Sequence, residues 1–213
     1  MQLVEFSQRF NQGLWKDTDP IYQIPCITED TLKKLKRAMK TKPDLGKLLA
    51  LTNEEREELD VFAATELQAV NEACSNYPRL GVTAQVLNEG DIGLHDFIEI
   101  KVRMERKHLK ENEEQGFVHS ENYPHLRRER LHIMIVDSIK EQFIFSYQWE
   151  DGQGAVEEQI IKIRAMAPVK FKVAVQVTSD SYIGVQARTD LEFTVKKREE
   201  VEDQFAYHEE DLR

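Results

Sequence analysis

The sequence predicts an α+β protein in which an N-terminal helical bundle, ending in a helix-loop-helix, precedes an antiparallel β-sandwich. Apolar residues recur at helical spacing as far as Tyr77-Pro78, and β-branched residues alternate with polar ones after that point. The chain has 213 residues, of which 40% are apolar, so it can bury a substantial core. We expect a helical subdomain at 1–77, a sandwich at 78–197 and an acidic tail at 198–213.

The first predicted helix covers residues 2–14 and places four apolar side chains on one stripe: Leu3, Phe6, Phe10 and Leu14. Gly13 and the cluster at 17–20 end it. A single helix of this length is marginally stable in water, so the apolar stripe needs a partner. Between Pro20 and Pro25 we expect an apolar loop without helix.

Four more short helices are predicted before Pro78. Thr28 is the expected N-cap of the first, and capping boxes at Thr52–Glu55 and Thr65–Gln68 begin the last two. The expected ranges are 29–39, 44–51, 53–62 and 66–76. These helices are short enough to form a compact bundle.

Seven strands are predicted after Pro78, at 82–87, 97–104, 131–136, 142–149, 159–163, 171–178 and 190–195. Seven short strands in a segment of this length fit an immunoglobulin-like, fibronectin type III-like sandwich. The charged stretch at 105–115 has no apolar face, and we expect a mobile loop there. Residues 126–130 form a basic patch, which we interpret as a solvated lead-in to the third strand.

The composition excludes several classes of protein. There are 39 acidic and 29 basic residues, which disfavours a general nucleic-acid binder because such a protein needs a basic face. No run of about 20 apolar residues occurs, so we expect no membrane-spanning segment. The first residues also lack the pattern of a signal peptide. Two cysteines, Cys26 and Cys74, cannot form a disulfide framework and favour a reducing compartment.

The sequence contains no recognisable catalytic motif. It lacks a glycine-rich phosphate loop, a nucleophile elbow and the common zinc and dithiol motifs. We therefore expect no enzymatic activity, no cofactor and no metal site. His119 and His125 are interpreted as solvated loop residues, and both cysteines as small core residues.

A polar motif follows the strongest predicted strand and has the features of a structural turn. Its five characteristic residues are Ser179, Asp180, Ser181, Tyr182 and Gly184. Short Ser and Asp side chains bond nearby backbone amides, and glycine permits a positive φ. The tyrosine can bury its ring while its hydroxyl finds a backbone acceptor, as in a tyrosine corner.

The last 16 residues carry seven acids against two arginines, which is half of the net charge of −10. Such a segment can solubilise the chain, or it can attract a basic partner with fast, salt-sensitive association. Aromatic residues within it favour the second interpretation. The expected partner-binding residues are Glu199, Glu200, Glu202, Asp203, Phe205, Tyr207, Glu209, Glu210 and Asp211.

Several motifs together resemble the Brl (Sec-sixty-three) domain family, over nearly the whole chain. They are the segments at 3–8, 21–25 and 48–56, the Tyr77-Pro78 entry to the first strand and, most specifically, Val177–Gly184. The family is shared by the translocon J-protein of the endoplasmic reticulum and by Ski-two-like RNA helicases. The resemblance implies a helical bundle, a helix-loop-helix and a fibronectin type III-like sandwich.

Three smaller features favour the translocon branch: the segment at 117–124, the charged insertion at 105–115 and the acidic tail. The resemblance then implies a non-catalytic scaffold for protein transport at the cytosolic face of the endoplasmic reticulum. Its expected partners are a translocation-channel subunit and a small basic membrane protein, with no nucleic acid. The alternative is an accessory cassette of a spliceosomal RNA helicase, whose RNA-binding cations would be Lys33, Lys34, Lys36, Arg37, Lys40 and Lys42.

Overall fold

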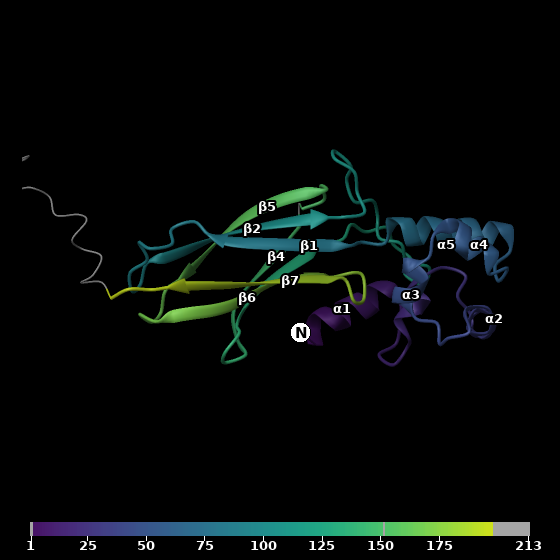
Figure 1. Cartoon of the computed structure of the whole chain (residues 1–213), viewed down its shortest axis with the longest axis horizontal. Helices are drawn as coiled ribbons and strands as arrows, with labels where there is room; N and C mark the ends of the chain where they lie inside the picture. Colours follow the sequence, from purple (N-terminus) through teal and green to yellow (C-terminus); the bar gives the residue numbers. More distant parts are fainter. Residues whose placement is uncertain (1, 151, 198–213) are drawn as a thin grey trace, which may run out of the picture.

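The computed structural model describes residues 2–150 and 152–197. Helices gather at one end of the long axis and two antiparallel sheets occupy the rest (Figure 1). The predicted α+β class is therefore confirmed. The acidic residues expected to bind a partner, Glu199 to Asp211, lie outside the described residues.

The helical part contains five α-helices and one 3-10 turn within the described residues. These are α1 (Gln2–Gln12), η1 (Pro20–Gln23), α2 (Glu29–Met39), α3 (Leu45–Ala50), α4 (Asn53–Glu58) and α5 (Ala64–Asn76). The expectation of a loop without helix after Asp19 is wrong, because Asp19 accepts a bond from the Ile21 amide and Pro20 begins a turn of 3-10 helix.

Two N-caps agree with the sequence prediction and one does not. The Thr28 hydroxyl accepts from the Thr31 amide, and Thr52 forms its capping box with Glu55. The last helix, however, begins two residues before its expected start. Glu66 accepts from the backbone amide of Ala63, so Ala63 takes the cap position expected for a threonine.

Seven strands form two sheets. They are β1 (Leu80–Val86), β2 (Phe97–Arg106), β3 (Leu131–Asp137), β4 (Gln142–Trp149), β5 (Val156–Arg164), β6 (Lys170–Ser179) and β7 (Gln186–Thr194). One sheet has the order β1-β2-β5 and the other β4-β3-β6-β7, and all neighbouring strands are antiparallel. Each strand overlaps the position predicted from alternation.

Two apolar cores stabilise the structure. One lies between the sheets, where Ile100, Ile133 and Val175 are fully buried. The other joins the helices and also includes Tyr182 and Val185, which follow the end of β6. The helical part therefore packs on the segment that carries the polar motif.

Candidate functional site

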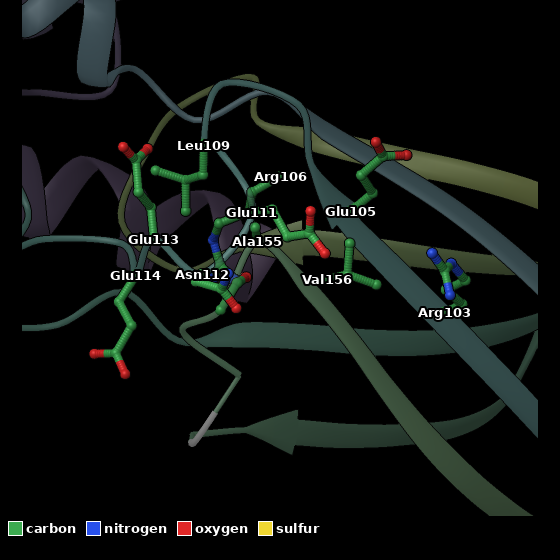
Figure 2. Close-up of a pocket in the computed structure, with 11 residues that line it drawn as sticks. Arg103, Glu105, Arg106, Leu109, Glu111, Asn112, Glu113, Glu114, Ala155 and Val156 are labelled. Carbon is green, nitrogen blue, oxygen red and sulfur yellow. The ribbon is translucent and has the colours of Figure 1, made fainter.

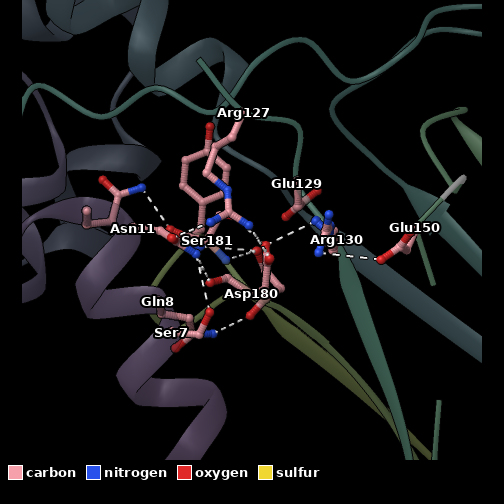
Figure 3. A network of polar contacts seen from close by, with 12 residues as sticks. Ser7, Gln8, Asn11, Arg127, Glu129, Arg130, Glu150, Asp180 and Ser181 are labelled. Carbon is pink, nitrogen blue, oxygen red and sulfur yellow. Dashed lines mark hydrogen bonds and ion pairs between the residues drawn. The ribbon is translucent and has the colours of Figure 1, made fainter. Parts of the chain in front are cut away.

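The polar motif after β6 receives one face of helix α1 (Figure 3). Gln8, Asn11 and Gln12 lie at helical spacing, and their side-chain amides donate to three successive carbonyl oxygens. The acceptors are the carbonyls of residues 179, 180 and 181, at 2.7, 2.7 and 2.8 Å. Amide groups therefore fix this helix on the motif by its polar face.

Asp180 is the charged centre of this contact. Its carboxylate pairs with the Arg127 guanidinium, which also donates to Asn11 on α1. The other carboxylate oxygen accepts from the Arg130 amide at 3.0 Å. Asp180 thus links α1, the segment before β3 and the turn after β6 while it is 3% exposed.

The remaining motif residues hold the turn. The Ser179 hydroxyl accepts from the amides of Ser181 and Tyr182, both at 3.1 Å. The Tyr182 hydroxyl does not donate to a carbonyl as expected, but accepts from the His119 amide at 3.0 Å. Burial raises the pKa of Tyr182 to about 12, so the phenol stays protonated. Gly184 has φ +85°, in the region that favours glycine.

The apolar stripe of α1 is exposed. Leu3, Phe6 and Phe10 are 85%, 68% and 60% exposed, because the opposite, polar face is the one in contact with the sandwich. Phe10 lies edge-on to Tyr123, with ring centroids 5.8 Å apart. Together with Leu14 and Trp15 these residues line an apolar groove. Among the described residues Tyr123 thus covers only part of Phe10, and most of the stripe stays exposed.

A buried ion pair lies behind the stretch expected to be a mobile loop. Arg106 and Glu129 are both 0% exposed, and a guanidinium nitrogen of Arg106 lies 3.1 Å from a carboxylate oxygen of Glu129. Arg106 also donates to the Gly154 carbonyl at 3.0 Å, and Gln153 donates to the Glu129 carbonyl at 2.8 Å. Burial raises the pKa of Glu129, and the nearby guanidinium opposes that rise.

These contacts correct two expectations. Residues 126–130 are not simply a solvated lead-in, since Glu129 is buried and Arg127 is bound to the polar motif. The stretch at 105–115 is also tied to the fold, because His108 bonds Gln115 at 2.6 Å and accepts from the Arg79 amide at 3.2 Å. Continued alternation of buried residues in β2 could have identified Arg106 as an inward position.

A hollow of about 690 Å³ lies between residues 103–114 and the start of β5 (Figure 2). Its rim carries Glu105, Glu111, Glu113 and Glu114, and Arg106 contributes to its wall. No group of three or more potential metal ligands is found in the described parts of the chain. His119 and His125 are exposed, Cys74 is buried and Cys26 is partly buried.

A cationic surface lies on α2 and the turn that follows it. Lys33, Lys34, Lys36, Arg37, Lys40 and Lys42 are all exposed. Only Lys33 forms an ion pair within the described residues, with Asp30 at 3.0 Å. None of the helices that the structure describes is long and apolar enough to cross a membrane.

Comparison with known proteins identifies relatives of one kind. An Arabidopsis thaliana DExH-box ATP-dependent RNA helicase, DExH12, is 22% identical over 194 residues, which is 91% of this chain and 9% of that protein. The human U5 small nuclear ribonucleoprotein 200 kDa helicase is 22% identical over 198 residues, covering 92% and 9%. A solved CARDB domain from Pyrococcus furiosus covers 55% of this chain and 88% of that domain, at 11% identity and a TM-score of 0.32, too low to support an argument.

These relatives overturn the translocon interpretation. Because the relatives are RNA helicases, three expectations are wrong. These are the role in protein transport, the partners from the translocation machinery without nucleic acid, and the location at the endoplasmic reticulum. The chain spans only about a tenth of their length. The expected family itself is confirmed: the model of the Sec63 Brl domain matches residues 1–192, and the chain belongs to this family.

Proposed function

We propose that this chain is a non-catalytic accessory module of a larger RNA helicase, and that the basic surface of α2 holds RNA through its phosphates. The proposal draws on relatives that are RNA helicases and in which the matching segment is a small part of the whole. Within such a protein the ATPase would lie elsewhere. This module would guide the single-stranded RNA.

The observation that carries the proposal is the distribution of charge. The chain has a net charge of −10, yet the six cations of the α2 surface are exposed on one helix and the turn after it. Five of them form no ion pair among the described residues. Free lysine and arginine side chains attract phosphates and release counterions on binding.

The side chains present also indicate the mode of binding. Residues 28–61 contain no aromatic residue on which a base could stack. Lysine and arginine contacts to phosphates position a strand without reading its sequence. The surface would therefore bind RNA with little sequence preference and with strong salt dependence.

The polar motif supports a structural role rather than a catalytic one. The Ser179 hydroxyl accepts two backbone amides, and the Asp180 carboxylate is occupied by Arg127 and by the Arg130 amide. A nucleophile or general base must instead be free to reach a substrate. On this basis the module supplies a scaffold and no chemistry.

The proposal also includes the type of β-sandwich and the bounds of the structural units. We assign an immunoglobulin-like, fibronectin type III-like sandwich, since strands one, two and five form one sheet and the others form the second. β4 pairs with β3 instead of β5, which differs from the constant-type immunoglobulin arrangement. We also retain 1–77 and 78–197 as the structural units, although Tyr182 and Val185 share the helical core.

The test is binding of a single-stranded RNA of mixed sequence, measured by fluorescence anisotropy at several salt concentrations. A triple variant, Lys34→Glu, Lys36→Glu and Arg37→Glu, should weaken binding at least about tenfold and flatten its salt dependence. The matched control is Lys107→Glu, Lys110→Glu and Lys140→Glu, which reverses three exposed cations outside α2 and the turn after it.

The control should bind almost as well as the unmodified chain. Equal losses in the two triple variants would show that only net charge matters and would contradict the proposed surface. Absence of RNA binding at low salt by the unmodified chain would refute the proposal itself. Circular dichroism checks that each variant is folded.

A further inference from the structure

Strand β4 is an unprotected edge of the four-stranded sheet. Its eight residues, Gln142–Trp149, include no charged residue and no proline. By contrast, β5 and β7, two of the other three strands that end a sheet, both carry charges. β1 is uncharged, but it lies beside β7 (Figure 1). Proteins normally protect exposed edges with charge, proline, a β-bulge or a covering segment, and of these β4 has only an irregularity near its start.

The edge is also accessible. Among the described residues, backbone hydrogen bonds join β4 only to β3. Alternate amides and carbonyls of β4 therefore point away from the sheet. Phe143, Ile144 and Tyr147 are exposed along the strand although they are large and apolar. Such an edge is a template for another extended strand.

We propose that β4 pairs antiparallel with β4 of a second copy of this chain, so that the two four-stranded sheets become continuous. A two-fold symmetric pair requires that each residue and its partner be separated by an even number of positions, because bonded and non-bonded pairs alternate along the ladder. Odd-numbered residues then meet odd-numbered ones. In β4 the odd-numbered residues are all aromatic: Phe143, Phe145, Tyr147 and Trp149.

The register with β3 identifies the paired segment. Phe145 lies opposite Ile135 and Phe143 opposite Val136, so an irregularity falls at Ile144. The regular part of the strand is thus 145–149, and its centre is Tyr147. In a dimer centred there, each Tyr147 faces its own copy, and Phe145 faces Trp149.

The neutral, aromatic character of the segment at 145–149 favours a second copy as the occupant. Each chain carries −10, which opposes association over most of the surface. The segment at 145–149 is neutral, so two copies can approach at this edge without placing like charges opposite one another. The aromatic side of one strand continues the aromatic side of the other, and the polar residues Ser146 and Gln148 meet on the opposite side.

The experiment measures the mass of the full chain by sedimentation equilibrium from micromolar to hundreds of micromolar concentration. A reversible dimer is expected. Ser146→Lys places a charge on the free edge at an exposed position and should raise the dimer dissociation constant at least about tenfold. The matched control, Ile160→Lys, adds the same charge to the exposed edge strand β5 and should leave the constant unchanged.

Two cysteine variants test the register. Under mild oxidation Tyr147→Cys should form a disulfide-linked dimer, because this residue faces its own copy. Ser146→Cys should not, and the unmodified chain controls for Cys26. A chain that stays monomeric at all concentrations would overturn the proposal. So would a dimer insensitive to Ser146→Lys, or one abolished by Phe6→Ser with Phe10→Ser on α1.

Discussion

Replacing Asp180 by alanine tests whether the polar motif holds helix α1 on the sandwich. The substitution removes the carboxylate that pairs with Arg127 and accepts from the Arg130 amide. Among the described residues, the Arg127 guanidinium would keep its bond to Asn11 on the helix and no other. The backbone carbonyl of residue 180, which accepts from the Asn11 side chain at 2.7 Å, would remain but on a less constrained turn.

The expected loss follows from these contacts. A hydrogen bond to a charged group contributes about 1.5–3 kcal/mol, and a buried amide left without an acceptor costs about 1–3 kcal/mol, of which the part-buried Arg130 amide contributes the lower end. Arg127 keeps partial access to water, which reduces its share. We expect Asp180→Ala to lower the free energy of unfolding by about 3–4 kcal/mol. Asp180→Asn retains an acceptor for the Arg130 amide and should lose about half as much.

Urea denaturation measures the global loss, and hydrogen exchange measures the local one. In the native state of the alanine variant, amides of α1 should exchange about tenfold faster for each 1.4 kcal/mol of lost contact energy. Amides of β2 lie in the sandwich core and serve as an internal reference. A total loss below about 1 kcal/mol would refute the argument. Unchanged exchange in α1 would refute it as well.

Two further predictions concern groups near β2. Arg106→Met should lower the free energy of unfolding, measured by urea denaturation, by about 3–5 kcal/mol because it leaves Glu129 buried without its partner. The double variant, Arg106→Met with Glu129→Leu, should lose clearly less than the sum of the two single changes. Additive losses would contradict this coupling. Burial lowers the pKa of His108, and its neutral ring accepts a hydrogen bond from the Arg79 amide. His108 therefore stabilises the folded state at neutral pH, and this contribution is lost as pH falls through the usual histidine pKa of 6.5. The difference in melting temperature between the unmodified chain and His108→Gln should therefore shrink between about pH 7.5 and about pH 5.5, and a constant difference would exclude this residue.

Local patterns predicted most of the secondary structure. The range of α2 and the capping box of α4 follow from side chains that bond backbone groups three residues away. Alternation located all seven strands, because burial of one sheet face imposes a period of two. The start of α5 differed from the prediction because the side chain of Glu66 accepts a hydrogen bond from the backbone amide of Ala63, which places the N-cap before the expected threonine.

Long-range polar contacts could not be predicted in this way. Gln8 and Ser179 are 171 positions apart, and nothing in either segment specifies the other. Hydrophobic spacing correctly identified an apolar stripe on α1, but spacing does not show which face of a helix contacts the rest of the chain. The Arg106–Glu129 pair could not be predicted either, because both residues lie in hydrophilic segments. The alternation of buried residues along β2 is the one sign that Arg106 points inward.

The choice between the two branches of the family depended on the least informative parts of the sequence. Residues 107–115 and 117–124 lie in the connection between β2 and β3, and the acidic tail lies outside the described residues. Connections vary in length and composition more readily than the elements they join. Similarity over 91% of the chain, which includes the core strands, outweighs such features.

The orientation of α1 has an energetic consequence for the whole module. Fully burying a large apolar side chain contributes about 1.5–3 kcal/mol, and Leu3, Phe6 and Phe10 each forgo most of that amount. Three amide-to-carbonyl bonds and the Asp180–Arg127–Asn11 contacts instead fix the helix by its polar face. Hydrogen bonds of this kind specify position more than they add stability. The module thus presents an exposed apolar helix face, and covering that face with another surface would gain the burial free energy that these side chains lack in the isolated chain.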